Sequence, residues 1–161
     1  MAAFIELFGG TGLAFLGAAL AVGLGCVGSA KGTGMVGEAA TGVISEMPEN
    51  FSKCLILQVL PGTQGLYGLV VGFMCMLSMG ILDGSYVDLT MAEGFRYFAA
   101  CLPIGIGGGI SAVAQGRVAA GSINLLAKKP NDWSKGMVLC ITVEFYAILS
   151  LLVSLLMLIR I

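Results

Sequence analysis

Histidine is absent from this 161-residue sequence, and charged residues make up only 11% of it. A soluble globular domain is about 25% charged, so the polar surface that such a domain needs is missing. Eight Lys and Arg residues are balanced by nine Asp and Glu residues, for a net charge of −1, and the basic residues form no stripe. This composition gives no support to binding of nucleic acid.

Metal-binding and catalytic motifs are missing as well. The five cysteines lie in or beside apolar stretches, and no two of them form a C-x-x-C pair. Structural zinc sites need clustered thiolates or imidazoles, so we predict that the cysteines are packing residues. No catalytic nucleophile, phosphate-binding loop or general base is evident. We therefore predict that the chain is not itself an enzyme.

Apolar residues dominate instead, at 58% of the sequence, with a mean hydropathy of +1.00. A helix crosses a hydrocarbon core of about 30 Å with roughly 20 apolar residues. Four stretches are long enough, at residues 7–30, 54–82, 97–116 and 136–159. The opening MAAFIELFGG lacks the basic region of a secretory signal, so we expect the first span to be retained. The sequence predicts an all-α membrane protein with four transmembrane helices.

Charges between the spans predict the orientation, because Lys and Arg in short loops stay on the cytoplasmic side. The middle connection carries Asp83, Asp88 and Glu93. We predict that this connection and both termini lie outside, and that the helix 1–2 and helix 3–4 loops are cytoplasmic. Six of the eight basic residues flank those two loops: Lys31, Lys53, Arg117, Lys128, Lys129 and Lys135.

An internal duplication becomes visible when the chain is aligned with itself so that Pro48 lies over Pro130. PENFSKCLIL, starting at Pro48, then lies over PNDWSKGMVL, starting at Pro130. This repeat predicts two tandem helical hairpins, residues 1–82 and 83–161. Each hairpin has an even number of spans, so the two copies are parallel and related by an axis along the membrane normal.

Glycine is concentrated in the first and third spans, whereas the second and fourth carry bulkier Leu, Met, Phe and Val. Small residues let membrane helices approach closely and gain dispersion contacts. We therefore expect the first and third helices to take an inner, crowded position and the other two to form an outer layer. A single four-helix unit is not expected to bury all the glycine faces, which predicts a homo-oligomer.

The fourth span contains one charged residue, Glu144, in the apolar segment 137–159. A charge at the centre of a bilayer costs about 2.5–3.5 kcal/mol even on insertion scales, so such residues indicate function. The same self-alignment places Gly62 over Glu144. Only the second hairpin therefore carries the carboxylate.

The second span supplies further polar groups, in LQVLPGTQGLYG at residues 57–68. Pro61 breaks the helix locally and leaves carbonyl oxygens near Leu60 without their usual donors. Hydroxyl, amide and carbonyl oxygens with one carboxylate are hard ligands, which suit an alkali or alkaline-earth ion, and one negative charge favours a monovalent ion. The candidate ion-binding residues are Leu60, Thr63, Gln64, Gln115 and Glu144, with Tyr67 as a donor to the carboxylate.

These motifs resemble one family: LPGTQGLYG in the second span, AQGRVAA closing the third, AKKP before the fourth and VEFYAIL within it. They resemble the proteolipid rotor protein of V-type and A-type rotary ATPases, also called the c or K subunit, and are most similar to bacterial Na+-translocating members. The resemblance implies Na+ held by the Leu60 carbonyl, Thr63, Gln64, Gln115 and Glu144, with Tyr67 bonded to the carboxylate. It also implies a ring of identical subunits in lipid, in a bacterial cell membrane, a stator subunit with an arginine, and central stalk subunits.

Three alternatives stay open at this stage. The rotor could carry H+ in place of Na+. A self-contained secondary transporter or channel could use Glu144 as a gate, although such carriers form their site between repeats of one chain. A structural protein with four spans would not need Glu144 at all.

Overall fold

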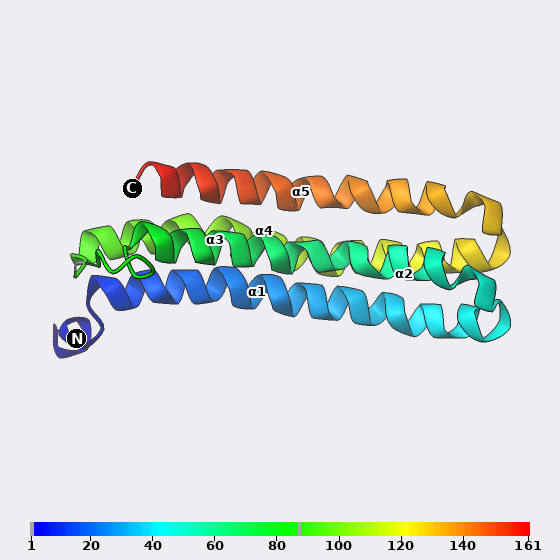
Figure 1. Ribbon diagram of the computed structural model, residues 1–161, viewed down its shortest axis with the longest axis horizontal. Helices are drawn as coiled ribbons and strands as arrows, with labels where there is room; N and C mark the ends of the chain where they lie inside the picture. Colours follow the sequence, from blue (N-terminus) through cyan, green and yellow to red (C-terminus); the bar gives the residue numbers. More distant parts are fainter. Residues whose placement is uncertain (1, 87) are drawn as a thin grey trace.

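The computed structural model describes the backbone of residues 2–86 and 88–161 and the side chains of residues 9–86 and 88–161. Residues 7 and 8 of the first predicted span lie outside the described side chains. Four long helical rods lie side by side (Figure 1), and the described backbone contains no strand. The elements are α1 (Ala2–Glu46), η1 (Pro48–Asn50), α2 (Phe51–Val59), η2 (Leu60–Gly62), α3 (Thr63–Ser78), α4 (Met91–Lys128), η3 (Pro130–Asp132) and α5 (Trp133–Ile159).

Three of the predicted spans lie within longer helices, whereas the second, residues 54–82, runs four residues past the end of α3 at Ser78. The four candidate membrane helices are Gly9–Glu46, Pro48–Ser78, Met91–Lys128 and Pro130–Ile159. The 38 residues of the first extend over about 57 Å at 1.5 Å per residue, against about 30 Å of hydrocarbon. The helices therefore continue beyond the apolar stretches, because mutual packing stabilises them where hydropathy alone predicts no span.

The rods form two hairpins that turn at the same end of the molecule. α1 turns through η1 into α2 and α3, and α4 turns through η3 into α5. Pro48 and Pro130 begin the two turns, where a missing N–H and a fixed φ suit the first position of a helix. The C-terminus and the connection between α3 and α4 lie at the opposite end (Figure 1). The predicted tandem hairpins are confirmed.

The first rods of the two hairpins pack directly on each other through glycine. A Cβ atom built at Gly28 would collide with the backbone of Gly109 in α4, and one at Gly116 would collide with the backbone of Gly32 in α1. Gly23 differs, since a Cβ there meets nothing within 4 Å. Some glycines of the chain thus lie in close contact between its own helices, whereas others lie uncovered on its surface.

Two apolar clusters form the core of the bundle, and the polar residues of the candidate site lie between them. One cluster, near the α3–α4 connection, includes Val71, Tyr97 and Ile104. The other, near the turns, includes Leu57 and Ile123. Four of the predicted packing cysteines are buried within the chain, whereas the fifth is exposed on its surface. The buried four are Cys54, Cys75, Cys101 and Cys140, and the exposed one is Cys26.

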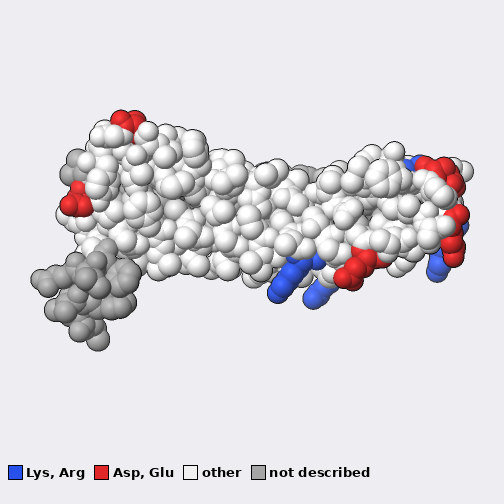
Figure 2. Space-filling view, turned by 60° about the horizontal axis from the view of Figure 1, so that its bottom comes forward, with Lys and Arg blue, Asp and Glu red and all other residues white. Residues whose placement is uncertain are grey.

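Charged side chains leave a wide uncharged band along the molecule. Figure 2 shows acidic residues at one end and mixed charges towards the other, with white surface between them. This distribution fits a protein that crosses a membrane, because exposed charges avoid hydrocarbon.

Candidate ion-binding site

Pro61 interrupts the second rod, as the sequence predicts. The segment Leu60–Gly62 adopts a 3₁₀ turn between α2 and α3. The carbonyl of Leu60 accepts the backbone N–H of Thr63 in that turn. The oxygen of this carbonyl also lies 3.0 Å from the hydroxyl oxygen of Thr63. The proline thereby turns the Leu60 carbonyl and the Thr63 hydroxyl towards each other.

Glu144 lies in α5 and is 8% exposed. Its Oε1 accepts two hydroxyl groups, from Thr63 and Tyr67, each at 2.6 Å. Its Oε2 accepts Nε2 of Gln115 at 2.7 Å. An ionised carboxylate only accepts hydrogen bonds. Three neutral side chains of α3 and α4 act as its donors. The only salt bridge among the described side chains joins Lys135 to Asp132, so no basic residue there pairs with Glu144.

Two buried glutamines extend the network across the bundle. Nε2 of Gln64 donates to Oε1 of Gln115 at 2.5 Å. Nε2 of Gln115 also donates to the Cys140 carbonyl at 3.1 Å, and the Thr63 hydroxyl lies 3.4 Å from Oε1 of Gln64. Both amides are fully buried. The structure thus brings together all six residues that the sequence singled out, although they come from three rods.

Serine hydroxyls support this network, a role that their residue type alone does not predict. Ser29 accepts the backbone N–H of Gly65 at 2.9 Å, immediately after the interrupted turn. Ser111 donates to the carbonyl of Val143 at 3.3 Å, beside Glu144. Serine in a membrane helix often bonds its own backbone, so only the fold distinguishes these two from the rest.

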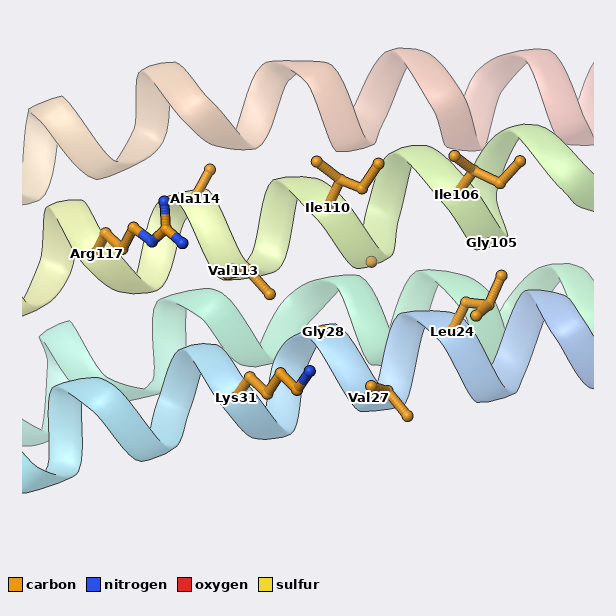
Figure 3. A pocket seen from close by; sticks show the side chains of 11 residues that line it. Leu24, Val27, Gly28, Lys31, Gly105, Ile106, Ile110, Val113, Ala114 and Arg117 are labelled. Atoms are coloured by element: carbon orange, nitrogen blue, oxygen red, sulfur yellow. The ribbon is translucent and has the colours of Figure 1, made fainter.

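A shallow groove lies between α1 and α4, away from this network. Figure 3 shows Lys31 and Arg117 near one end and apolar side chains along the rest. None of the six candidate residues lines it, and its lining contains no carboxylate. The groove therefore lacks the ligands that a cation needs. Its lining is Leu24, Val27, Gly28, Lys31, Gly105, Ile106, Gly109, Ile110, Val113, Ala114 and Arg117.

Comparison with known families decides the identity of this bundle. The family model that describes the C subunit of ATP synthase matches twice, at residues 16–75 and 98–157. The starts of the two matches, at 16 and 98, are separated by the same interval as Pro48 and Pro130 in the internal repeat. The chain belongs to the ATP synthase C-subunit family. The resemblance and the tandem duplication seen in the sequence are confirmed.

Relatives of this C-subunit chain come from several kinds of rotary ATPase. It is 44% identical, over 92% of each chain, to the V-type sodium ATPase subunit K of Enterococcus hirae. It is 35% identical to the A-type ATP synthase subunit K of Methanocaldococcus jannaschii, over 91% of this chain and 62% of that one. It is 30% identical to the 16 kDa proteolipid, or c subunit, of the V-type proton ATPase of Nephrops norvegicus, over 86% and 85% of the two chains.

Family membership establishes the general function of this chain. It is a non-catalytic, ion-translocating rotor subunit of a rotary ATPase and an integral, multi-pass membrane protein. Members of this family form rings of identical copies. The alternatives of a self-contained transporter and of a purely structural protein are therefore set aside.

Proposed function

We propose that each copy binds and carries one Na+ at Glu144, coupled to ATP hydrolysis in the soluble sector of the complex. The supporting observation is the cluster around this carboxylate, where Thr63 and Tyr67 donate to one oxygen and Gln115 to the other. The proposed Na+ ligands are oxygens of Leu60, Thr63, Gln64, Gln115 and Glu144, and Tyr67 orients the carboxylate.

The chemistry of the cluster favours a small hard cation. Its oxygen atoms come from a carboxylate, amides, a hydroxyl and a backbone carbonyl. Such ligands suit alkali and alkaline-earth ions, and a dehydrated ion needs several of them to replace its water. One buried negative charge balances a monovalent ion and leaves a divalent ion with an uncompensated charge, which is costly in a low-dielectric site.

In the proposed cycle, Glu144 exchanges its counter-charge as the ring turns. The bound ion neutralises the carboxylate while the subunit faces lipid, and an arginine of a stator subunit neutralises it between the two half-channels. Central stalk subunits transmit the rotation. Moving one charge across the membrane potential takes about 2.3 kcal/mol per 100 mV, so a single carboxylate per chain suffices for a substantial coupled step.

The proposed setting is a bacterial cell membrane, with the turns η1 and η3 on the cytoplasmic side. Basic residues near these turns support this orientation through the positive-inside rule. The glycine-rich helices α1 and α4 are proposed to lie on the inside of the ring. The boundary between the two hairpins is proposed to fall between residues 82 and 83, within the connection from α3 to α4.

Proton transport is the second candidate, because relatives include a protein named for a proton ATPase. A proton needs only the carboxyl group and one hydrogen-bond acceptor. The buried pair Gln64 and Gln115, joined at 2.5 Å beside Glu144, favours Na+.

Carbodiimide labelling of the purified rotor ring separates the two candidates. A carbodiimide attacks the protonated carboxyl, so labelling of Glu144 should be faster at low pH, and Na+ should protect because ion and proton compete for one site. We expect protection at millimolar Na+. An equal labelling rate with and without Na+, at every pH where the carboxyl reacts, would mean that the ring carries protons.

Matched glutamine variants sharpen this experiment. Gln115→Leu should weaken protection by Na+ while keeping the acid-dependent labelling, because it removes a ligand but leaves the carboxyl. Gln58→Leu is the control, since Gln58 lies in α2, where its amide is beside Gly37 and outside the network. Equal protection in both variants would count against an amide ligand.

A further inference from the structure

The two turns at the end of the molecule opposite the α3–α4 connection are built alike. η1 (Pro48–Asn50) and η3 (Pro130–Asp132) are 3₁₀ turns that correspond in the internal repeat. A lysine follows each turn and bonds back to the polar residue three positions earlier. Nζ of Lys53 donates to Asn50 Oδ1 at 3.1 Å, and Nζ of Lys135 lies 2.8 Å from Asp132 Oδ1.

Lys53 makes one further contact that connects the two hairpins. Its Nζ donates to the carbonyl of Pro130, in the other turn, at 3.4 Å. Lys135 has no such second partner among the described residues, and its side chain is 73% exposed. The paired polar residues differ in the same way, since Asn50 is 3% exposed, whereas the Asp132 side chain is 33% exposed. The second turn therefore lacks the cover that the first turn receives.

A ring supplies that cover from the next copy of the chain. Two kinds of hairpin alternate around such a ring, so every first hairpin follows a second hairpin of the preceding copy. If the contact between hairpins repeats at each step, Lys135 corresponds to Lys53 and Pro48 corresponds to Pro130. The carbonyl of Pro48 accepts the Phe51 N–H, and a carbonyl oxygen has two lone pairs, so it can accept a lysine as well.

Charge favours this contact between copies over the one within a chain. Pro48 lies between two exposed acids, Glu46 and Glu49. Pro130 follows two lysines, Lys128 and Lys129, and precedes one acid, Asp132. A lysine approaching Pro48 therefore enters an acidic environment, and complementary charge fixes partner and register across an interface.

We propose that Lys135 of one copy docks on the Pro48 carbonyl of the next copy, between Glu46 and Glu49. The partner is thus a second copy of this chain, and the contact joins the cytoplasmic turns of neighbouring subunits around the ring. The inference rests on the ring of identical subunits in the proposed function, but not on the ion that the ring carries.

Cross-linking in the intact ring tests the contact. Lys135→Cys and Glu49→Cys are combined in one chain, with Cys26→Ser to remove the exposed native thiol. A short bismaleimide should then give a ladder of dimers, trimers and larger products on a denaturing gel. Either cysteine variant alone should give no ladder. A ring that migrates normally on a native gel but yields no ladder would overturn the contact and leave the ring standing.

Charge exchange provides the second measurement. Lys135→Glu should lower the temperature at which the ring dissociates, and adding Glu49→Lys should restore roughly half of the loss or more, as expected for groups in contact. No recovery in the Lys135 pair would overturn the proposal. An unmodified chain that forms no ring would overturn both this contact and the proposed function.

Discussion

Positions 62 and 144 correspond in the two hairpins, and their environments differ sharply. Gly62 has no side chain, and the nearest atom to a Cβ built there is Cγ2 of Thr33 at 3.5 Å. Glu144 is buried and accepts three hydrogen bonds. A clash at the Cβ atom of position 62 is therefore not what separates the two hairpins.

Most partner residues of the carboxylate are found in the other hairpin, the one that lacks the carboxylate. Thr63, Gln64 and Tyr67 of the first hairpin correspond to three residues of the second whose side chains are 58%, 69% and 57% exposed, namely Phe145, Tyr146 and Leu149. One hairpin has kept the carboxylate and the other has kept most of its partners. A complete site therefore needs one hairpin of each kind, which explains why the described residues of a duplicated chain form a single such cluster.

Removing the carboxylate should have the largest effect. Glu144→Gln keeps the shape of the side chain and removes the charge that must be exchanged, so ion-coupled ATP hydrolysis should be lost while the ring still assembles. ATP hydrolysis and ion uptake in membrane vesicles measure the coupling. A native gel measures ring assembly. Uptake at the wild-type rate would refute the role of Glu144.

Adding Gly62→Glu to that variant sharpens the comparison between hairpins. A Cβ atom fits at position 62, but the corresponding partners are Phe145, Tyr146 and Leu149 rather than the donors around Glu144. We therefore expect no recovery of transport. Recovery would show that position alone, without the partner residues, makes the site.

Glycine contacts between α1 and α4 should come next in effect. Gly28→Ala places a Cβ 2.6 Å from the Cα of Gly109, so the helices must separate, at a cost of about 1–3 kcal/mol. Gly42→Ala is the matched control, because a Cβ there meets nothing within 4 Å. Thermal unfolding in detergent should separate the two variants. Equal midpoints would mean that the close approach contributes nothing to stability.

Tyr67→Phe should have a moderate effect on ion binding. It removes one donor to Oε1 of Glu144, while Thr63 still donates to the same oxygen. We expect Na+ protection from carbodiimide to need about tenfold more Na+, which corresponds to about 1.4 kcal/mol. Tyr146→Phe, on an exposed tyrosine of α5, serves as the control and should leave protection unchanged.

The smallest effect is expected from a change beside Asp83, an exposed carboxylate in the connection between α3 and α4. Hydrogen bonds from the Ser85 hydroxyl and backbone N–H lower the pKa of Asp83. A lowered pKa means that these bonds are fully present above the usual pKa of an aspartate, about 3.9, and are lost only as the pH falls through the folded value. Ser85→Ala should raise the Asp83 pKa in an NMR titration, whereas Ser45→Ala, on α1, should not.

Much of the architecture follows from the sequence because its signals are local. Long apolar stretches predict helices that cross a membrane, the repeat from Pro48 to Pro130 predicts paired hairpins, and Pro61 predicts a break in the second rod. Glu144 is evident too, since a charge in an apolar stretch is costly wherever the chain folds. The residue types around it, together with the family resemblance, were sufficient to name the candidate ligands.

Tertiary structure alone decided which groups meet and how. Side-chain contacts between rods depend on helix rotation and height, so only the fold pairs Gln64 with Gln115. Helix length was likewise decided by packing, which extends α1 to Glu46, well past its apolar stretch. Glycine content indicated close packing, but only the structure separates Gly28, pressed against α4, from Gly23, which faces open space. Composition is a property of one helix, whereas contact is a property of two.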